Sequence, residues 1–235
     1  MHATLRIGLL AWALVLALGG AESATLEPYA LTEPSADGIG KWHLGREIAQ
    51  VMGHEGAEWL DRPEREEEER PALVVDTLRL RATDVVADIG AGTSYFSLRL
   101  AAIARRVYAV DIQPEMLALL RAKAADAGVA NIEPVLGTID DPRLPAASID
   151  LALFVDVYHE LEYPVELMNA LRVALRPGGR VALVEYRAED PDVPIKPLHT
   201  MSEAQARLEM ASLGFEWVET IATLPRQHLL VFRRP

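Results

Sequence analysis

Two acidic side chains and a glycine-rich turn between them carry the clearest chemistry in the sequence. Asp88 precedes a turn that contains Gly90 and Gly92. The glycines let the backbone approach a ligand closely, and a helix that begins after them offers free N–H groups. Asp111 follows roughly 20 residues later, where an acid can accept the hydroxyls of an adenosine ribose. Because Asp88 would repel a pyrophosphate, we expect a cationic group there, which argues against a nucleotide-dependent oxidoreductase.

A second group of polar side chains follows the apolar run 149–155. Asp156 comes first, and Tyr158, His159 and Glu160 come directly after it. Strands of a parallel sheet end at one edge, so these side chains are expected near the glycine turn. His159, with Tyr158 beside it, is placed to act as the general base for an acceptor hydroxyl or amine. The alternative is structural: His159 caps a loop or bonds to a backbone group.

Histidines are scattered along the chain, and imidazole with carboxylate suits Zn, Cu or Fe. The candidates are His54, His159, His199 and His228, with Asp156 or Glu185 nearby. Their spacing follows no tight ligand pattern, so no metal site is predicted. The chain also has no cysteine, which excludes disulfides, thiolate metal sites and cysteine nucleophiles.

The elements that must position these groups follow from the alternation of β-rich and helical segments after Thr83. Strands are predicted at 85–89, 107–110, 132–136, 149–155 and 181–185. Helices are predicted at 95–103, 114–127, 163–175 and 202–213. Two further runs, 215–223 and 228–232, predict an antiparallel hairpin at the sheet edge. The pattern predicts an α/β fold: a Rossmann-like, doubly wound, mostly parallel seven-stranded sheet with a C-terminal antiparallel hairpin.

The first 23 residues have the composition of an export signal. A short basic start is followed by the apolar run Ile7–Leu18 and then by small residues, with a predicted cleavage before Ala24. We therefore expect an exported, periplasmic protein. The alternative is an uncleaved anchor in the membrane, although the apolar run is shorter than the roughly 20 residues that span a bilayer.

Residues 24–80 predict a linker followed by a helical extension. The segment 25–40 is aperiodic and contains Pro and Gly, whereas helices are predicted at 43–52 and from Pro63 onward. The acidic run 64–69 is typical of a solvated helix start, where carboxylates suit the helix dipole.

Composition limits the possible partners. The chain has 235 residues, half of them hydrophobic, and a formal net charge of −12. This length has room for one α/β domain. An acidic surface without a basic stripe repels phosphate backbones, so no nucleic-acid partner is expected. A small molecule or a protein is the expected substrate, a membrane is expected only through an uncleaved signal, and the oligomeric state is not indicated.

From Thr83 to Phe232 these motifs resemble the class I S-adenosylmethionine (SAM)-dependent methyltransferases. The similar segments are Asp-Ile-Gly-Ala-Gly at 88–92, Val-Asp-Ile at 110–112, 137–141 with 144–145, 148–160 and 175–180. The resemblance implies that SAM is the cofactor and that residues 81–235 form the methyltransferase domain. One residue departs from the family pattern: Ser94 stands where the third glycine is usual.

The resemblance also implies roles for individual residues around SAM. Gly90 and Gly92 line the cofactor, and Asp111, followed by Ile112, holds its ribose. The cationic group expected beside Asp88 from its charge and position is then the ammonium group of SAM. The adenine is read by Asp140 or by the backbone of Ile139, and Asp156 lies near the methionine end.

The chain is also similar to a smaller group of exported bacterial methyltransferases. The similar segments are 45–49, 52–54 and 62–66. This second resemblance places 185–187, 196–199 and 227–228 at the mouth of the pocket. The expected function is methyl transfer from SAM to an unidentified small-molecule or protein acceptor. The alternative is a SAM-binding sensor or accessory protein without transferase activity.

Overall fold

The computed structural model describes residues 27–235. The predicted signal peptide, residues 1–23, and its cleavage position lie outside these residues. Within 27–235, every helix is too short or too polar to cross a membrane.

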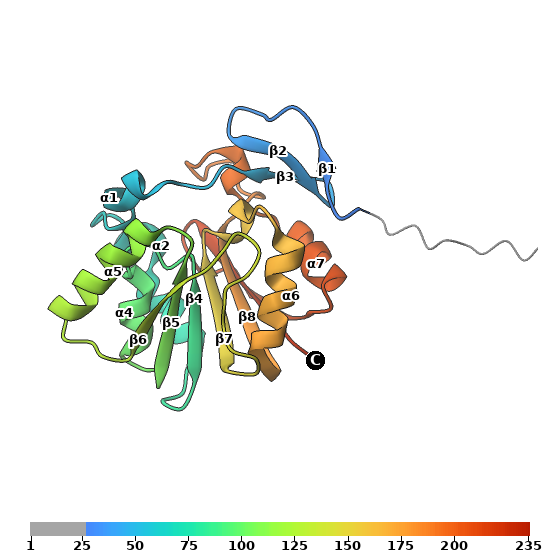
Figure 1. Ribbon diagram of the computed structural model, residues 1–235. Helices are drawn as coiled ribbons and strands as arrows, with labels where there is room; N and C mark the ends of the chain where they lie inside the picture. Colours follow the sequence, from blue (N-terminus) through green and yellow to red (C-terminus); the bar gives the residue numbers. More distant parts are fainter. Residues whose placement is uncertain (1–26) are drawn as a thin grey trace, which may run out of the picture.

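A seven-stranded sheet forms the centre of the molecule (Figure 1), in the order β6-β5-β4-β7-β8-β10-β9. The strands are β4 (Val85–Ile89), β5 (Arg106–Asp111), β6 (Ile132–Leu136), β7 (Ile149–Val155), β8 (Leu175–Tyr186), β9 (Glu216–Ile221) and β10 (Gln227–Arg233). Neighbours from β6 to β8 are parallel, and β10 is antiparallel to both β8 and β9. The predicted α/β class and C-terminal hairpin are confirmed, with β10 lying between β8 and β9.

Helices cover both faces of this sheet. They are α3 (Pro71–Thr77), α4 (Tyr95–Ala101), α5 (Pro114–Asp126), α6 (Pro164–Ala174) and α7 (Glu203–Ser212). Buried side chains of α3 and α4 pack on the face that carries Val86, whereas those of α6 and α7 pack on the face that carries Ala87. Because both faces are covered, the inner strands are hydrophobic almost throughout rather than alternating with polar residues.

The helix predicted at 43–52 is wrong. This segment belongs to a small antiparallel sheet of β1 (Ala30–Leu31), β2 (Gly38–His43) and β3 (Arg46–Ala49). Leu44 and Gly45 join β2 to β3 with φ angles of 47° and 90°. Two consecutive residues with positive φ make the tight hairpin turn that matches the twist of the flanking strands, which ends any helix at this point.

The rest of the N-terminal extension consists of short helices. They are η1 (His54–Gly56), α1 (Ala57–Leu60) and α2 (Arg65–Glu69). Figure 1 shows the small sheet lying over the end of the central sheet at which β7 and β8 finish. Short helices follow at that end: η2 (Tyr158–Glu160) comes after β7, and η3 (Pro197–His199) comes in the loop after β8. The extension thereby covers the edge where the predicted functional side chains gather.

Candidate active site

A cavity of about 830 Å³ lies at the carboxyl ends of β4, β5 and β7. Its floor contains the glycine turn after β4 and the residues that follow β5 and β7. Its walls come from the N-terminal extension and from the loop that contains η3. Ligands of open α/β sheets bind at this edge of the strands, so the cavity is the candidate active site.

The turn after β4 requires glycine at two positions. Gly90 has φ +70°, and a Cβ there would lie 2.5 Å from Cγ2 of Val157. Gly92 has φ +52°, and its Cβ would lie 2.9 Å from Cδ1 of Leu60. Both glycines line the cavity, as predicted. The absence of side chains leaves the backbone open to a ligand.

Asp111 lies at the end of β5 and lines the cavity. Its Oδ2 accepts the Gly92 N–H at 2.9 Å, and its Oδ1 accepts the Gln113 N–H at 2.9 Å. Burial raises the pKa of this carboxyl. Since an ionised carboxylate has about four lone-pair positions, each oxygen can still accept one hydroxyl. The side chain is therefore fixed in place by the glycine turn and remains able to bind a diol.

The adenine-side residues divide into two kinds. Ile112 and Ile139 line the cavity and are partly exposed. Asp140 does not line it: its exposed carboxylate accepts a hydrogen bond from Thr138 Oγ1 at 2.7 Å. Of the two residues predicted to read adenine, the structure places Ile139 at the cavity and Asp140 outside it.

Asp88 also lies away from the cavity, which corrects the expectation that it faces the cationic end of a ligand. Successive strand residues point to opposite faces, and Ile89 lines the cavity whereas Asp88 faces α4. The Ser97 hydroxyl donates to its Oδ2 at 2.6 Å. Burial raises the pKa of Asp88 to about 6.

Asp156, which directly follows β7, lines the cavity, whereas Asp88 does not. It has φ +55°, and its Oδ2 accepts from Gln227 Nε2 at 2.7 Å. Its Oδ1 is buried and has no hydrogen-bond partner among the described residues. Burial, followed by the charges of Glu69 and Glu185, raises the pKa of Asp156 well above its usual value. Asp156 lines the cavity, so a cationic group bound there would favour the ionised form of its carboxyl.

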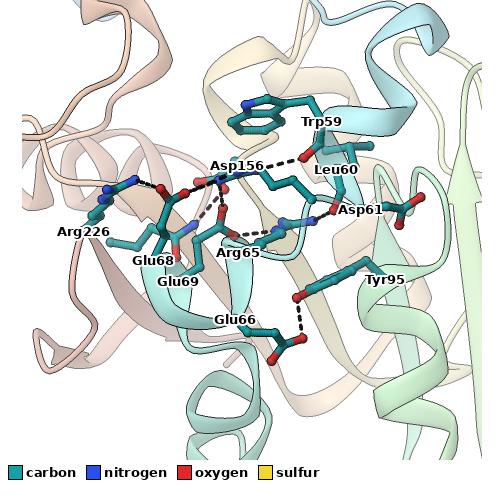
Figure 2. Close-up of polar contacts among 12 residues, drawn as sticks. Trp59, Leu60, Asp61, Arg65, Glu66, Glu68, Glu69, Tyr95, Asp156 and Arg226 are labelled. Atoms are coloured by element: carbon teal, nitrogen blue, oxygen red, sulfur yellow. Dashed lines mark hydrogen bonds and ion pairs between the residues drawn. The ribbon is translucent and has the colours of Figure 1, made fainter.

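The acidic helix α2 lies next to Asp156. Figure 2 shows Arg65, Glu68 and Glu69 grouped beside Asp156. Glu69 is fully buried and accepts hydrogen bonds from Arg65 Nε at 2.6 Å and from Tyr186 Oη at 3.0 Å. The expectation that 64–69 is only a solvated helix start is therefore wrong for its last residue, because two arginines compensate the buried charge.

His159 also lines the cavity, in η2 directly after β7. Its side chain is almost fully buried, and its Nδ1 lies 2.6 Å from Oε2 of Glu185. Burial alone would lower the pKa of His159, but the adjacent Glu185 carboxylate outweighs burial and raises it. Glu185 in turn accepts the Tyr158 N–H at 2.8 Å. This contact orients the ring and leaves Nε2 as the nitrogen on the side of His199.

Contrary to the prediction, Tyr158 does not take part in the site. Its side chain is fully buried in the core that α6 and α7 form with the sheet, 6.2 Å from the Phe154 ring centroid. It does not line the cavity. Burial raises the pKa of its hydroxyl well above the usual value, so the residue is a core side chain rather than an acceptor-side group.

His199 and Glu160 join His159 at the cavity. Nδ1 of His199 lies 3.2 Å from Nε2 of His159 and 3.3 Å from Oε1 of Glu160. His54 and His228 lie outside this group. Sequence spacing could not reveal the cluster, because His199 is brought to η2 only by the loop after β8.

The N-terminal extension supplies cavity walls that sequence reasoning missed. Ile39, Met52 and Leu60 line the cavity. Arg46 fixes the small sheet through a bidentate pair with the fully buried Glu209, at 2.7 and 3.0 Å, and donates to the His159 carbonyl at 3.0 Å. The predicted pocket-mouth residue Lys196 also lines the cavity.

Known proteins resemble this chain in sequence. Residues 87–183 match the family described as "Methyltransferase domain". An uncharacterized methyltransferase of Mycobacterium tuberculosis is 37% identical over 114 residues, 48% of this chain and 44% of the relative. The ubiquinone biosynthesis O-methyltransferase of Xanthomonas axonopodis pv. citri is 23% identical over 64% of this chain and 56% of its own length. The chain thus spans about half the length of the curated relatives it matches.

Solved structures share the fold. A SAM-dependent methyltransferase from Aquifex aeolicus aligns with a TM-score of 0.74 at 22% identity, over 79% of this chain and all of the other. A [4+2]-cyclase aligns with a TM-score of 0.62 at 16% identity, over 71% of this chain and 80% of the other. The fold and the matched domain imply SAM as the cofactor. Three features of the cavity fit this cofactor: the glycine turn without side chains, the Asp111 carboxylate and the Asp156 carboxylate.

Proposed function

We propose that this protein is a class I SAM-dependent methyltransferase that modifies an acceptor bound beside His159. One observation carries the proposal. The glycine turn, Asp111 and Asp156 line a single cavity, within the segment that matches the methyltransferase domain. These groups suit a ligand with a diol at one end and an ammonium group at the other.

SAM supplies a methyl group already activated on a sulfonium, so the protein's task is mainly alignment and exclusion of water. Asp111 would hold the ribose hydroxyls and Asp156 the ammonium end, while Ile112 and Ile139 offer apolar contacts to the adenine. His159 stands at the acceptor end. Its Nδ1 is held by Glu185 at 2.6 Å, so Nε2, which lies 3.2 Å from Nδ1 of His199, is the nitrogen that would receive a proton from an acceptor hydroxyl or amine.

The acceptor is proposed to be a small molecule or a protein side chain. The cavity is roofed by the N-terminal extension, and apolar residues such as Ile39, Met52 and Leu60 line it. The net charge of −12 disfavours nucleic acid. Export to the periplasm, or anchoring by an uncleaved N-terminal segment, remains a proposal from residues 1–23.

A second function uses the same site without methyl transfer, in a SAM-binding sensor or accessory protein. The structural likeness to a [4+2]-cyclase illustrates that this fold also carries other activities. Acceptor-dependent turnover separates the two functions, because a sensor binds SAM and modifies nothing.

The test incubates the full chain with methyl-labelled SAM and cell-envelope extracts, followed by mass analysis of small molecules and proteins. We expect label in one acceptor with the wild type and much less with Asp111→Ala when SAM is near the wild-type dissociation constant. SAM and NAD affinities are measured by calorimetry in parallel. Tight SAM binding without label transfer to any fraction would favour the sensor, and tighter binding of NAD than of SAM would overturn the cofactor assignment.

A further inference from the structure

We propose that His159, Glu160 and His199 bind one divalent transition-metal ion at the acceptor end of the cavity. All three side chains line that cavity. They come from η2 and η3, two short helices that follow different strands and meet only in the folded chain. The described residues contain this one such group of ligand atoms.

The three ligand atoms lie about as far apart as neighbouring ligands of one ion. Nε2 of His159 is 3.2 Å from Nδ1 of His199, which is 3.3 Å from Oε1 of Glu160. Metal–ligand bonds of about 2.0–2.2 Å at tetrahedral or octahedral angles separate adjacent ligand atoms by about 3.0–3.5 Å. The third separation, from Nε2 of His159 to Oε1 of Glu160, is 3.8 Å. This separation is slightly longer than that range, so the Glu160 carboxylate would have to move toward His159 to bind the same ion.

A second layer of contacts prepares His159 as a ligand. Its Nδ1 lies 2.6 Å from Oε2 of Glu185, whose other oxygen accepts the Tyr158 N–H at 2.8 Å. A carboxylate that accepts Nδ1–H fixes the ring and leaves the Nε2 lone pair for a metal. The His159 and His199 rings meet at an interplanar angle of 76°, with Nε2 and Nδ1 converging. Two imidazole nitrogens this close need a shared proton or a shared cation between them.

The donor set selects the class of ion. Two imidazoles and one carboxylate suit Zn(II) or Fe(II) and leave coordination positions open for another ligand. Mg²⁺ and Ca²⁺ prefer sites built from oxygen alone. The open positions are on the cavity side, because all three ligand residues line it.

The role of the ion, unlike the site itself, rests on the proposed methyl transfer. An ion here binds an acceptor oxygen and lowers the pKa of a hydroxyl, whose proton leaves to solvent. The acceptor is then a hydroxyl-bearing molecule. With the ion bound, Nε2 of His159 is a ligand, and the ion takes the place of the imidazole in activating the acceptor.

The test is a titration of the full chain, made without a polyhistidine tag and stripped by a chelator, with Co(II). The visible d–d bands of Co(II) report ligand type and coordination number, and Zn(II) competition gives the affinity. We expect one ion per chain. His199→Ala should weaken binding roughly 100-fold, and Glu185→Gln about 10- to 100-fold, as for second-layer partners. His54→Ala, at a partly exposed histidine outside the cluster, is the matched control and should bind as the wild type does.

The outcomes are separable because the metal titration is done without SAM. Absence of stoichiometric binding, or equal affinity in His199→Ala and the wild type, overturns the metal site. His199 is partly exposed on a loop, and thermal unfolding verifies that its variant is folded. A chain that binds SAM and transfers methyl but takes up no ion refutes the metal site alone. A chain that binds one ion but no SAM keeps the metal site and refutes the proposed function.

Discussion

Removal of the Asp111 carboxylate should weaken SAM binding without unfolding the protein. The side chain is buried at the end of β5, and each of its oxygens accepts one backbone N–H at 2.9 Å. Asp111 lines the cavity, and each of its oxygens has capacity for a further hydrogen bond, such as one from a ribose hydroxyl. Hydrogen bonds to a charged group contribute about 1.5–3 kcal/mol, so Asp111→Ala should raise the SAM dissociation constant about 10- to 150-fold.

Two comparisons make this measurement specific. Asp111→Asn keeps the shape and volume but has one acceptor oxygen for the two backbone N–H groups that Asp111 binds, so comparison with Asp111→Ala separates the loss of volume from the loss of charge and of one acceptor. Asp140→Ala removes an exposed carboxylate that does not line the cavity, and should leave SAM affinity within about twofold. Calorimetry should be run near pH 8, because burial raises the pKa of Asp111.

A folded Asp111→Ala variant with unchanged SAM affinity would refute the assignment of this carboxylate to the ribose. Equal losses in Asp111→Ala and Asp140→Ala would show that the effect is general electrostatics rather than a contact. Thermal unfolding of each variant establishes that the fold survives.

Four further predictions follow from other sites. His159→Ala should lower turnover about 10²- to 10⁴-fold with SAM affinity nearly unchanged, measured by label transfer to the acceptor. Arg46→Ala should lower the free energy of unfolding, measured in urea, by about 3–5 kcal/mol, because the buried Glu209 charge loses its partner. Replacing both Arg46 and Glu209 by apolar residues should recover much of this loss. Burial raises the pKa of Asp88 from 3.8 to about 6, so the protonated carboxyl stabilises the fold fully below about pH 4, and this stability is lost as the pH rises through 6. Asp88→Asn should therefore raise the free energy of unfolding by up to about 3 kcal/mol at pH 8 and leave it unchanged at pH 4, measured by denaturation without SAM. N-terminal sequencing of envelope protein should begin near Ala24, and an intact N-terminus in the cytosolic fraction contradicts it.

The central fold was predictable because its signal is local. The predicted strands 85–89 and 149–155 coincide with β4 and β7, since inner parallel strands read as continuous hydrophobic runs. The glycine turn and Asp111 were predictable for a related reason: both lie next to such strands, and strand ends in a parallel sheet share one edge.

Other features depend on contacts that spacing does not encode. The Leu44-Gly45 turn makes a hairpin of a segment whose apolar pattern also fits a helix. Asp88 follows the alternation of β4 away from the cavity, so its position next to the glycines was misleading. Glu69 is buried because Arg62 and Arg65 reach it, which a run of acidic residues does not indicate.

The N-terminal extension is part of the site, although the alternation of β-rich and helical segments that marks the domain 81–235 is absent from residues 24–80. Leu60 lies over the Gly92 position, and the Met52 carbonyl accepts from Gln113 Nε2 at 3.0 Å, two residues from the Asp111 carboxylate. Arg46 joins the small sheet to α7 and to the backbone of His159. The matched methyltransferase segment, 87–183, contains none of these walls. We therefore propose that the extension contributes to acceptor choice. Substitutions at Ile39 in β2 and Ala49 in β3, which line the cavity, should then alter which acceptor is used before they alter SAM binding.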